Sequence, residues 1–166
     1  MKAKFILITS IVLGVDLLTK HLVSTIPRLQ GIAIVPHYVH ISFAANSGIF
    51  FRLLDDFNPV WKPYLLAGMA MVPVLVIIIY SIRRPSGPVL LQAALALIAG
   101  GLLGNFADRI LHGAVIDFIE VHVENSIYYP TFNVADLAIV IGIAMLLIRI
   151  KRRSAHARKQ TQLVSE

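Results

Sequence analysis

Long apolar runs separated by short polar stretches dominate the hydrophobic pattern of this 166-residue chain. A helix needs about 20 consecutive apolar residues to cross the hydrocarbon core of a bilayer. Four segments approach that length, at about residues 5–26, 64–82, 89–106 and 133–150. The pattern therefore predicts an all-α membrane protein with four transmembrane helices.

The two longer connections between these runs alternate apolar and polar residues instead. The first contains IAIVPHYVHISFAANSGIFF, in which β-branched and aromatic residues alternate before Asn and Gly, and the second contains GAVIDFIEVHVEN. Such alternation is typical of short strands. We expect a small β-rich cradle outside the membrane, with a surface loop or helix. The connections are too short to fold separately, so residues 1–166 are predicted to form a single domain.

Composition and charge support a membrane protein. The chain is 57% hydrophobic and 14% charged, whereas soluble domains carry about a quarter charged residues. Ten basic residues occupy the two ends and the turn between the second and third runs: Lys2, Lys4, Arg83, Arg84, Arg149, Lys151, Arg152, Arg153, Arg158 and Lys159. The positive-inside rule then places both termini in the cytoplasm and the long connections outside. The net charge of +6 is explained by topology, and no nucleic-acid partner is expected.

The two ends of the chain have their own interpretations. Lysines ahead of an apolar stretch resemble a secretory signal, but the apolar register continues past Asp16 and Lys20 without a small-residue cleavage site. We therefore expect an uncleaved first helix. The basic tail, 151–166, is predicted to rest on the anionic membrane surface. Because cysteine is absent, disulfides and thiolate chemistry are excluded.

Ionisable residues inside the predicted spans are the first candidates for function, because a charge in hydrocarbon is costly and usually faces protein or water. Asp16 and Lys20 are four residues apart on one helix face and can pair. They form either a structural ion pair or a contact to substrate near the outer leaflet.

The motif GGLLGNFADR holds a second group of candidates. Gly100 and Gly104 form a small-residue face that lets another helix approach closely. Asn105, Asp108 and Arg109 share a face at the outward end of the third span. They either cap and anchor that end or support a site there.

Two aspartates are predicted to meet at the outer rim of the membrane. Asp117 lies in GAVIDF, and Asp136 lies in FNVAD about one turn into the fourth span, with Asn133 on the same face. Two carboxylates in a low dielectric repel, and such a pair comes to share one proton. One can then act as general base on water while the other donates a proton to a carbonyl oxygen. Two independently satisfied carboxylates are the alternative.

Other chemistries have weaker support. Lys20 with Ser24 or Ser47 would make a Ser–Lys pair, but no spacing enforces it. Histidines occur at four positions on the outer side, His37, His40, His112 and His122, without a metal-binding framework such as HExxH. Asn46 and Gly48 in ANSGIFF form either a plain turn or a clamp on a substrate backbone.

In sequence order, the blocks DLLTK, NSG, GGLLGNFADR, GAVIDF and FNVAD resemble the prolipoprotein signal peptidases (signal peptidase II), a family of bacterial inner-membrane aspartic peptidases. The resemblance implies a catalytic dyad of Asp117 and Asp136. It also implies a set of supporting residues around that dyad: Asp16, Lys20, Asn46, Gly48, Gly104, Asn105, Asp108, Arg109, Phe132, Asn133 and Ala135.

The resemblance further implies a substrate. It would be a prolipoprotein that already carries diacylglycerol, cut on the N-terminal side of the lipidated cysteine near the periplasmic face. Membrane lipid would surround the enzyme, and cyclic peptides such as globomycin would inhibit it. No metal or organic cofactor is expected, and a monomer is the expected state. Two rival hypotheses are a proton-coupled transporter that uses Asp16, Lys20 and Asp136 as a relay, and a scaffold without enzymatic activity.

Overall fold

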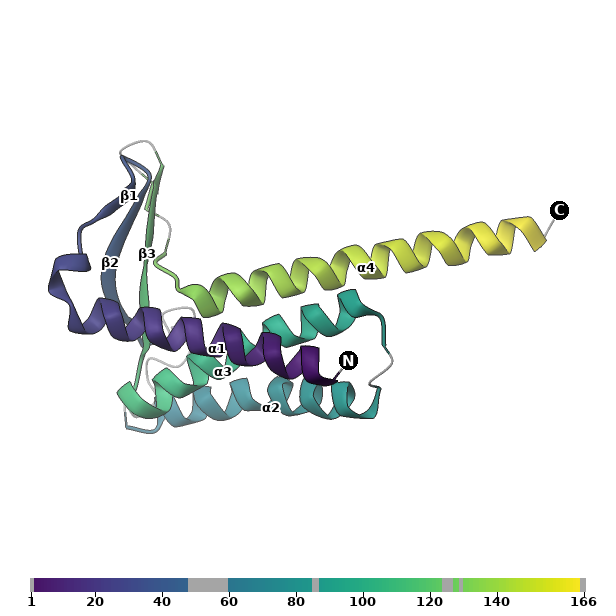
Figure 1. Ribbon diagram of the computed structural model, residues 1–166, viewed down its shortest axis with the longest axis horizontal. Helices are drawn as coiled ribbons and strands as arrows, with labels where there is room; N and C mark the ends of the chain where they lie inside the picture. The colour runs from purple at the N-terminus through teal and green to yellow at the C-terminus, as the bar shows by residue number, and fades with distance from the viewer. Residues whose placement is uncertain (1, 48–59, 85–86, 124–126, 129, 165–166) are drawn as a thin grey trace.

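The computed structural model describes residues 2–47, 60–84, 87–123, 127–128 and 130–164 (Figure 1). Helices make up most of this part of the chain: α1 (Lys2–Thr25), α2 (Lys62–Arg83), α3 (Val89–His112), α4 (Val134–Val164) and a short 3₁₀ helix, η1 (Pro27–Leu29). Its strands are β1 (Ala33–Val35), β2 (Val39–Asn46), β3 (Val115–Val123) and β4 (Ile127–Tyr128). The protein is mostly helical with a small sheet, as the sequence predicts.

Three of the described helices are long and apolar enough to cross a membrane: Ala3–Thr25, Lys62–Arg83 and Val89–His112. These correspond to the first three predicted spans. The third extends beyond residue 106, so Asn105 and Arg109 lie within its last turns. The helix α4 is not among them. A fourth membrane span therefore stays a prediction.

The helix α3 lies at the centre of the helical part and packs against α1, α2 and α4. Buried residues make up 61% of its apolar segment, against 22% for each of α1 and α2. Its glycines permit this close packing. A Cβ atom on Gly100 would lie 2.8 Å from the Val12 Cβ of α1, and one on Gly101 would collide with the Ala135 carbonyl of α4. This is the small-residue packing typical of membrane helices.

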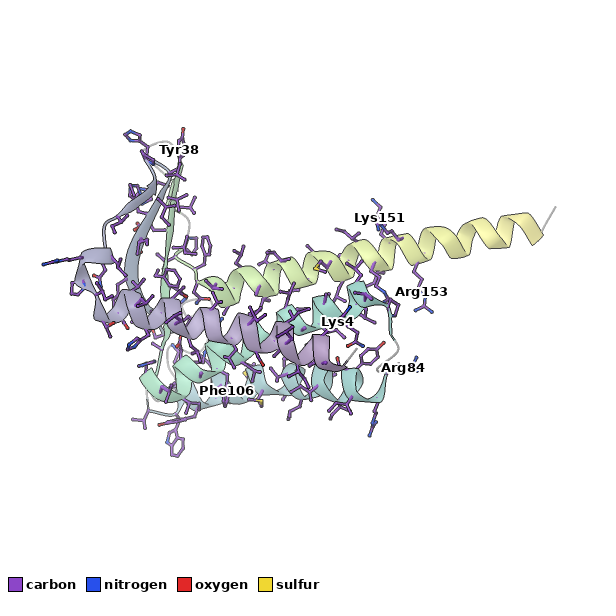
Figure 2. The ribbon with its side chains drawn as sticks, in the orientation of Figure 1. Lys4, Tyr38, Arg84, Phe106, Lys151 and Arg153 are labelled. Atoms are coloured by element: carbon purple, nitrogen blue, oxygen red, sulfur yellow. The ribbon has the colours of Figure 1, made fainter. Side chains whose placement is uncertain are left out.

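The strands form one antiparallel sheet in the order β1-β2-β3-β4. Figure 1 shows this sheet at one end of the helices, while the start of α1, the end of α2, the start of α3 and the far end of α4 lie toward the other. Lys4, Arg84 and Arg153 accordingly gather at the end remote from the sheet (Figure 2). The predicted β-rich cradle is present, and these three basic residues lie at the opposite end from it.

The sheet also leads the chain into α4. Phe132 pairs with Ile119 of β3 outside the named strands. Its carbonyl accepts hydrogen bonds from the N–H groups of Phe118 at 3.0 Å and Ile119 at 2.8 Å, and its own N–H donates to the Ile119 carbonyl at 3.1 Å. The first turn of α4 is therefore held beside the middle of β3.

Candidate active site

Asp117 and Asp136 come from different elements that the sheet brings together. Asp117 lies in β3, directly opposite Ala44 of β2, and its side chain is buried. Asp136 lies in the first turn of α4 and is only half-buried. The two predicted carboxylates thus share one place but differ in their access to solvent.

Asn133 connects the two carboxylates. Its Nδ2 donates to Asp117 Oδ1 at 2.7 Å. Its Oδ1 accepts the backbone N–H of Asp136 at 2.9 Å, and its own N–H donates to Asp136 Oδ2 at 3.3 Å. Because α4 begins at the next residue, this is a reciprocal capping box with an aspartate in the third helical position. One fully buried amide therefore caps the helix and holds both acids.

Asp117 also receives a hydrogen bond from Asn46, whose Nδ2 donates to Oδ2 at 2.9 Å. Burial raises the pKa of Asp117 to about 6. The hydrogen bond from Asn46 lowers this pKa and the charge of Asp136 raises it again, with smaller lowering contributions from Asn133 and Lys20. Both side-chain oxygens of Asp117 are thus held by amide donors that favour the ionised carboxylate, whereas burial and the charge of Asp136 favour the neutral acid and raise the pKa.

A buried network of ion pairs lies beside the two carboxylates. Lys20 Nζ lies 2.7 Å from Asp16 Oδ2 and 2.9 Å from Asp108 Oδ2. It also donates to Asn105 Oδ1 at 3.0 Å. Asn105 in turn connects Lys20 to the second carboxylate, because its Nδ2 donates to Asp136 Oδ1 at 2.7 Å. The lysine therefore orients the amide that orients the second carboxylate.

Comparison with known proteins identifies the family of this chain. Residues 8–152 match the family described as signal peptidase (SPase) II. The chain belongs to the signal peptidase II family. A lipoprotein signal peptidase of Pseudomonas fluorescens is 38% identical over 145 residues, which cover 87% of this chain and 85% of the relative. One from Yersinia enterocolitica is 40% identical over 138 residues, covering 82% and 80%.

Solved structures show the same fold. A bacterial membrane enzyme determined at 2.3 Å superposes with a TM-score of 0.77 at 26% identity, covering 93% of this chain and 91% of that one. Another, determined at 1.9 Å, gives 0.74 at 27% identity, covering 89% and 92%. This signal peptidase II homologue is therefore a membrane peptidase, and its apolar helices make it an integral protein of the inner membrane.

Several of the predicted supporting residues make contacts with the backbone. Asp16 Oδ1 accepts the N–H of Ala135 at 2.8 Å and thereby fixes the start of α4 against α1. Gly104 makes room for this contact, since a Cβ atom there would collide with the Asp16 carboxylate. Arg109 Nη1 donates to the Asn105 carbonyl at 3.0 Å.

The structure brings these predicted residues together around the dyad, with Phe132 contributing its backbone to β3. Gly48 lies outside the described residues. The Ser–Lys alternative has no support, because the Lys20 ammonium is held by two carboxylates and an amide while Ser24 donates to the His21 carbonyl. The ring centroids of His40 and His122 lie 4.8 Å apart with the rings tilted by 57°, but no group of three metal-ligating side chains occurs in the described part of the chain.

Ile116 is a site residue that the sequence did not reveal. Its N–H donates to Asp108 Oδ2 at 3.0 Å, and its carbonyl accepts Asn133 Nδ2 at 3.3 Å. Asp108 thus holds the first residues of β3 as well as Lys20. Since only backbone atoms are involved, the apolar side chain at this position carries no signal of the role.

Proposed function

We propose that the protein removes the signal peptide from diacylglyceryl-modified prolipoproteins, cutting before the lipidated cysteine with water activated by Asp117 and Asp136. The relatives named above are lipoprotein signal peptidases, which supports the substrate class. The observation that carries the mechanism is the Asn133 bridge, in which one side chain donates to Asp117 at 2.7 Å and accepts from the Asp136 backbone at 2.9 Å.

The asymmetry of the two acids suggests their roles. Asp136 is half-buried at a helix N-terminus, where a negative charge is favoured. Asp117 is buried, and its pKa is raised to about 6. We assign the shared proton to Asp117, because burial and the neighbouring Asp136 raise its pKa. A bound lipidated peptide would exclude further water and favour this neutral carboxyl more strongly.

The reaction then needs only the two acids and a water molecule. Asp136 takes a proton from water as the water oxygen attacks the scissile carbonyl carbon, and Asp117 gives its proton to the carbonyl oxygen. In the second step Asp136 passes its proton to the leaving nitrogen, and Asp117 recovers its own as the carbonyl re-forms. The peptide bond is broken, one water is consumed, and both acids return to their starting state.

The proposed setting is a four-span protein with cytoplasmic termini and the dyad near the periplasmic face. The basic residues at the end of the helices remote from the sheet support this orientation, and α4 has an uncharged stretch from Leu137 to Ile148. The acyl chains of the substrate would enter from the plane of the bilayer. Cyclic peptides such as globomycin would compete for the same place, and one copy of the chain suffices for the site.

The test is cleavage of a purified precursor with and without the diacylglyceryl group. The wild-type protein in a bilayer should cut only the lipidated precursor. Asp117→Asn and Asp136→Asn should each abolish cleavage while leaving the protein folded. Glu120→Gln is the matched control, because Glu120 lies on the same strand as Asp117 and pairs with His122 at 3.1 Å. Turnover by either aspartate variant would refute the mechanism in which both aspartates are required.

The transporter and scaffold hypotheses make different predictions. A proton relay requires polar groups through the full depth of the membrane. Most buried polar side chains of the described residues instead belong to the dyad and its network; the others are Ser81 and Gln92. A substrate-flux assay in proteoliposomes tests the transporter, and catalytic turnover by the wild type excludes a pure scaffold.

A further inference from the structure

A basic cavity lies at the end of the helices remote from the dyad. Its volume is about 470 Å³, within the range of about 300–1,000 Å³ that small ligands occupy. It is lined by residues from the end of α2, the start of α3 and the part of α4 that is remote from the sheet: Tyr80, Arg83, Arg84, Gly87, Pro88, Leu91, Arg149 and Arg153. The peptidase mechanism uses none of them.

The four arginines bring their charges to this cavity from two helices. Arg149 and Arg153 are four residues apart on one face of α4, and Arg83 and Arg84 end α2. The ion pairs found among the described residues involve other basic groups, at the sheet end of the molecule. Like charges that line one cavity repel, so the arrangement favours an anion that neutralises them.

The surroundings identify the kind of anion. Ile82 and Ile150, which are adjacent in sequence to the lining residues Arg83 and Arg149, are 54% and 58% exposed, so apolar surface is available to acyl chains at this end of the helices. Tyr80 lines the cavity, and tyrosine is enriched at the level of lipid headgroups. Guanidinium groups bind phosphate oxygens in pairs, and basic pockets between membrane helices hold anionic headgroups.

We propose that this cavity binds the phosphate of an anionic phospholipid from the leaflet at that end of the helices. The lipid would join α2 to α4 through its headgroup and lay its acyl chains along the apolar helix surface. This differs from a diffuse attraction between a basic tail and the membrane. Figure 2 shows the difference on α4: Arg153 extends toward the α2 end that carries Arg84, whereas Lys151 extends to the opposite side.

Lipid titration followed by native mass spectrometry tests the proposal on the full chain released from detergent micelles. Phosphatidylglycerol is the probe, and phosphatidylcholine is the zwitterionic comparison. The double variant R149Q/R153Q removes two charges from the cavity. The matched control K151Q/R152Q removes two charges from the same turns of α4 but from residues that do not line it.

We expect R149Q/R153Q to bind phosphatidylglycerol at least about tenfold more weakly than the wild type, and K151Q/R152Q less than about threefold more weakly. Arg83→Gln should also weaken binding, which tests the same cavity from α2 and remains informative if the α4 double variant fails to fold. Equal losses in the two double variants would overturn the proposal in favour of diffuse attraction. Displacement of the lipid by millimolar inorganic phosphate would show a site for free phosphate instead.

Discussion

Replacing Asn133 by serine separates the two contributions of this side chain at the start of α4. Its Oδ1 caps the helix by accepting the Asp136 N–H at 2.9 Å, and its Nδ2 donates to Asp117 Oδ1 at 2.7 Å. A serine hydroxyl is an equally good helix cap, but it is too short to reach the strand that carries Asp117. Asn133→Ser should therefore keep α4 in place and remove one of the two hydrogen bonds that hold Asp117.

The expected size of the effect follows from these contacts. A hydrogen bond between neutral groups contributes about 0.5–1.5 kcal/mol, and about 1.4 kcal/mol corresponds to a factor of ten. If the bond holds the neutral Asp117 for proton transfer, kcat/KM of Asn133→Ser should fall by between about 2-fold and about 12-fold. Asn133→Ala loses the cap as well, which costs about 1 kcal/mol of stability and lowers Tm by about 2–4 °C.

The assay measures cleavage of a diacylglyceryl-modified precursor together with thermal unfolding in the same detergent. We expect Asn133→Ser to have a Tm close to that of the wild type and reduced activity, and Asn133→Ala to be lowered in both. Wild-type kcat/KM in Asn133→Ser would refute the bridging role and leave Asn133 as a helix cap alone.

Three further predictions concern the surroundings of the dyad. Gly104→Ala should lower Tm, because its Cβ would collide with the buried Asp16 carboxylate, whereas Gly14→Ala, with nothing within 4 Å, should not; equal melting of the two would contradict the packing argument. Lys20→Gln should destabilise the protein by about 3–5 kcal/mol by leaving its two partner carboxylates uncompensated, which a lowered yield and Tm would report. The pKa of Asp117 is raised from 3.8 to about 6, so its ionisation lowers the stability of the wild type as pH rises from about 4 to 6. Because Asp117→Asn cannot ionise at this position, the difference between its Tm and that of the wild type should increase over that range. A Tm difference that stays constant with pH would contradict the raised pKa.

The hydrophobic pattern along the chain predicted the positions of the helices better than their ends. The first three predicted spans correspond to α1, α2 and α3, and the fourth predicted segment begins one residue before α4. The ends were less accurate: α3 continues to His112, and α4 continues to Val164, well beyond residue 150. Apolar content predicts where a helix can lie in a bilayer, but a helix continues until a cap or a breaker stops it. Gly113, with a φ of 76°, does so for α3.

The site was predictable in its residue types but not in its connections. Charged and amide side chains inside apolar segments indicated Asp16, Lys20, Asn105 and Asp136 as candidates, because such groups are costly there. Which carboxylate Lys20 would contact besides Asp16 could not be read from the spacing. The Asp108 contact depends on how α1 lies against α3.

By itself, the sequence determined the membrane class, the position of the first three spans, the charge difference between the two ends and the pair of aspartates, because hydrophobicity and charge act locally and add along the chain. Only the tertiary structure decided that Asn133 joins the two acids, that Asp117 is buried while Asp136 is half-exposed, and that four arginines line one cavity. Those features come from contacts between residues far apart in the chain, and their geometry follows from strand register and helix packing.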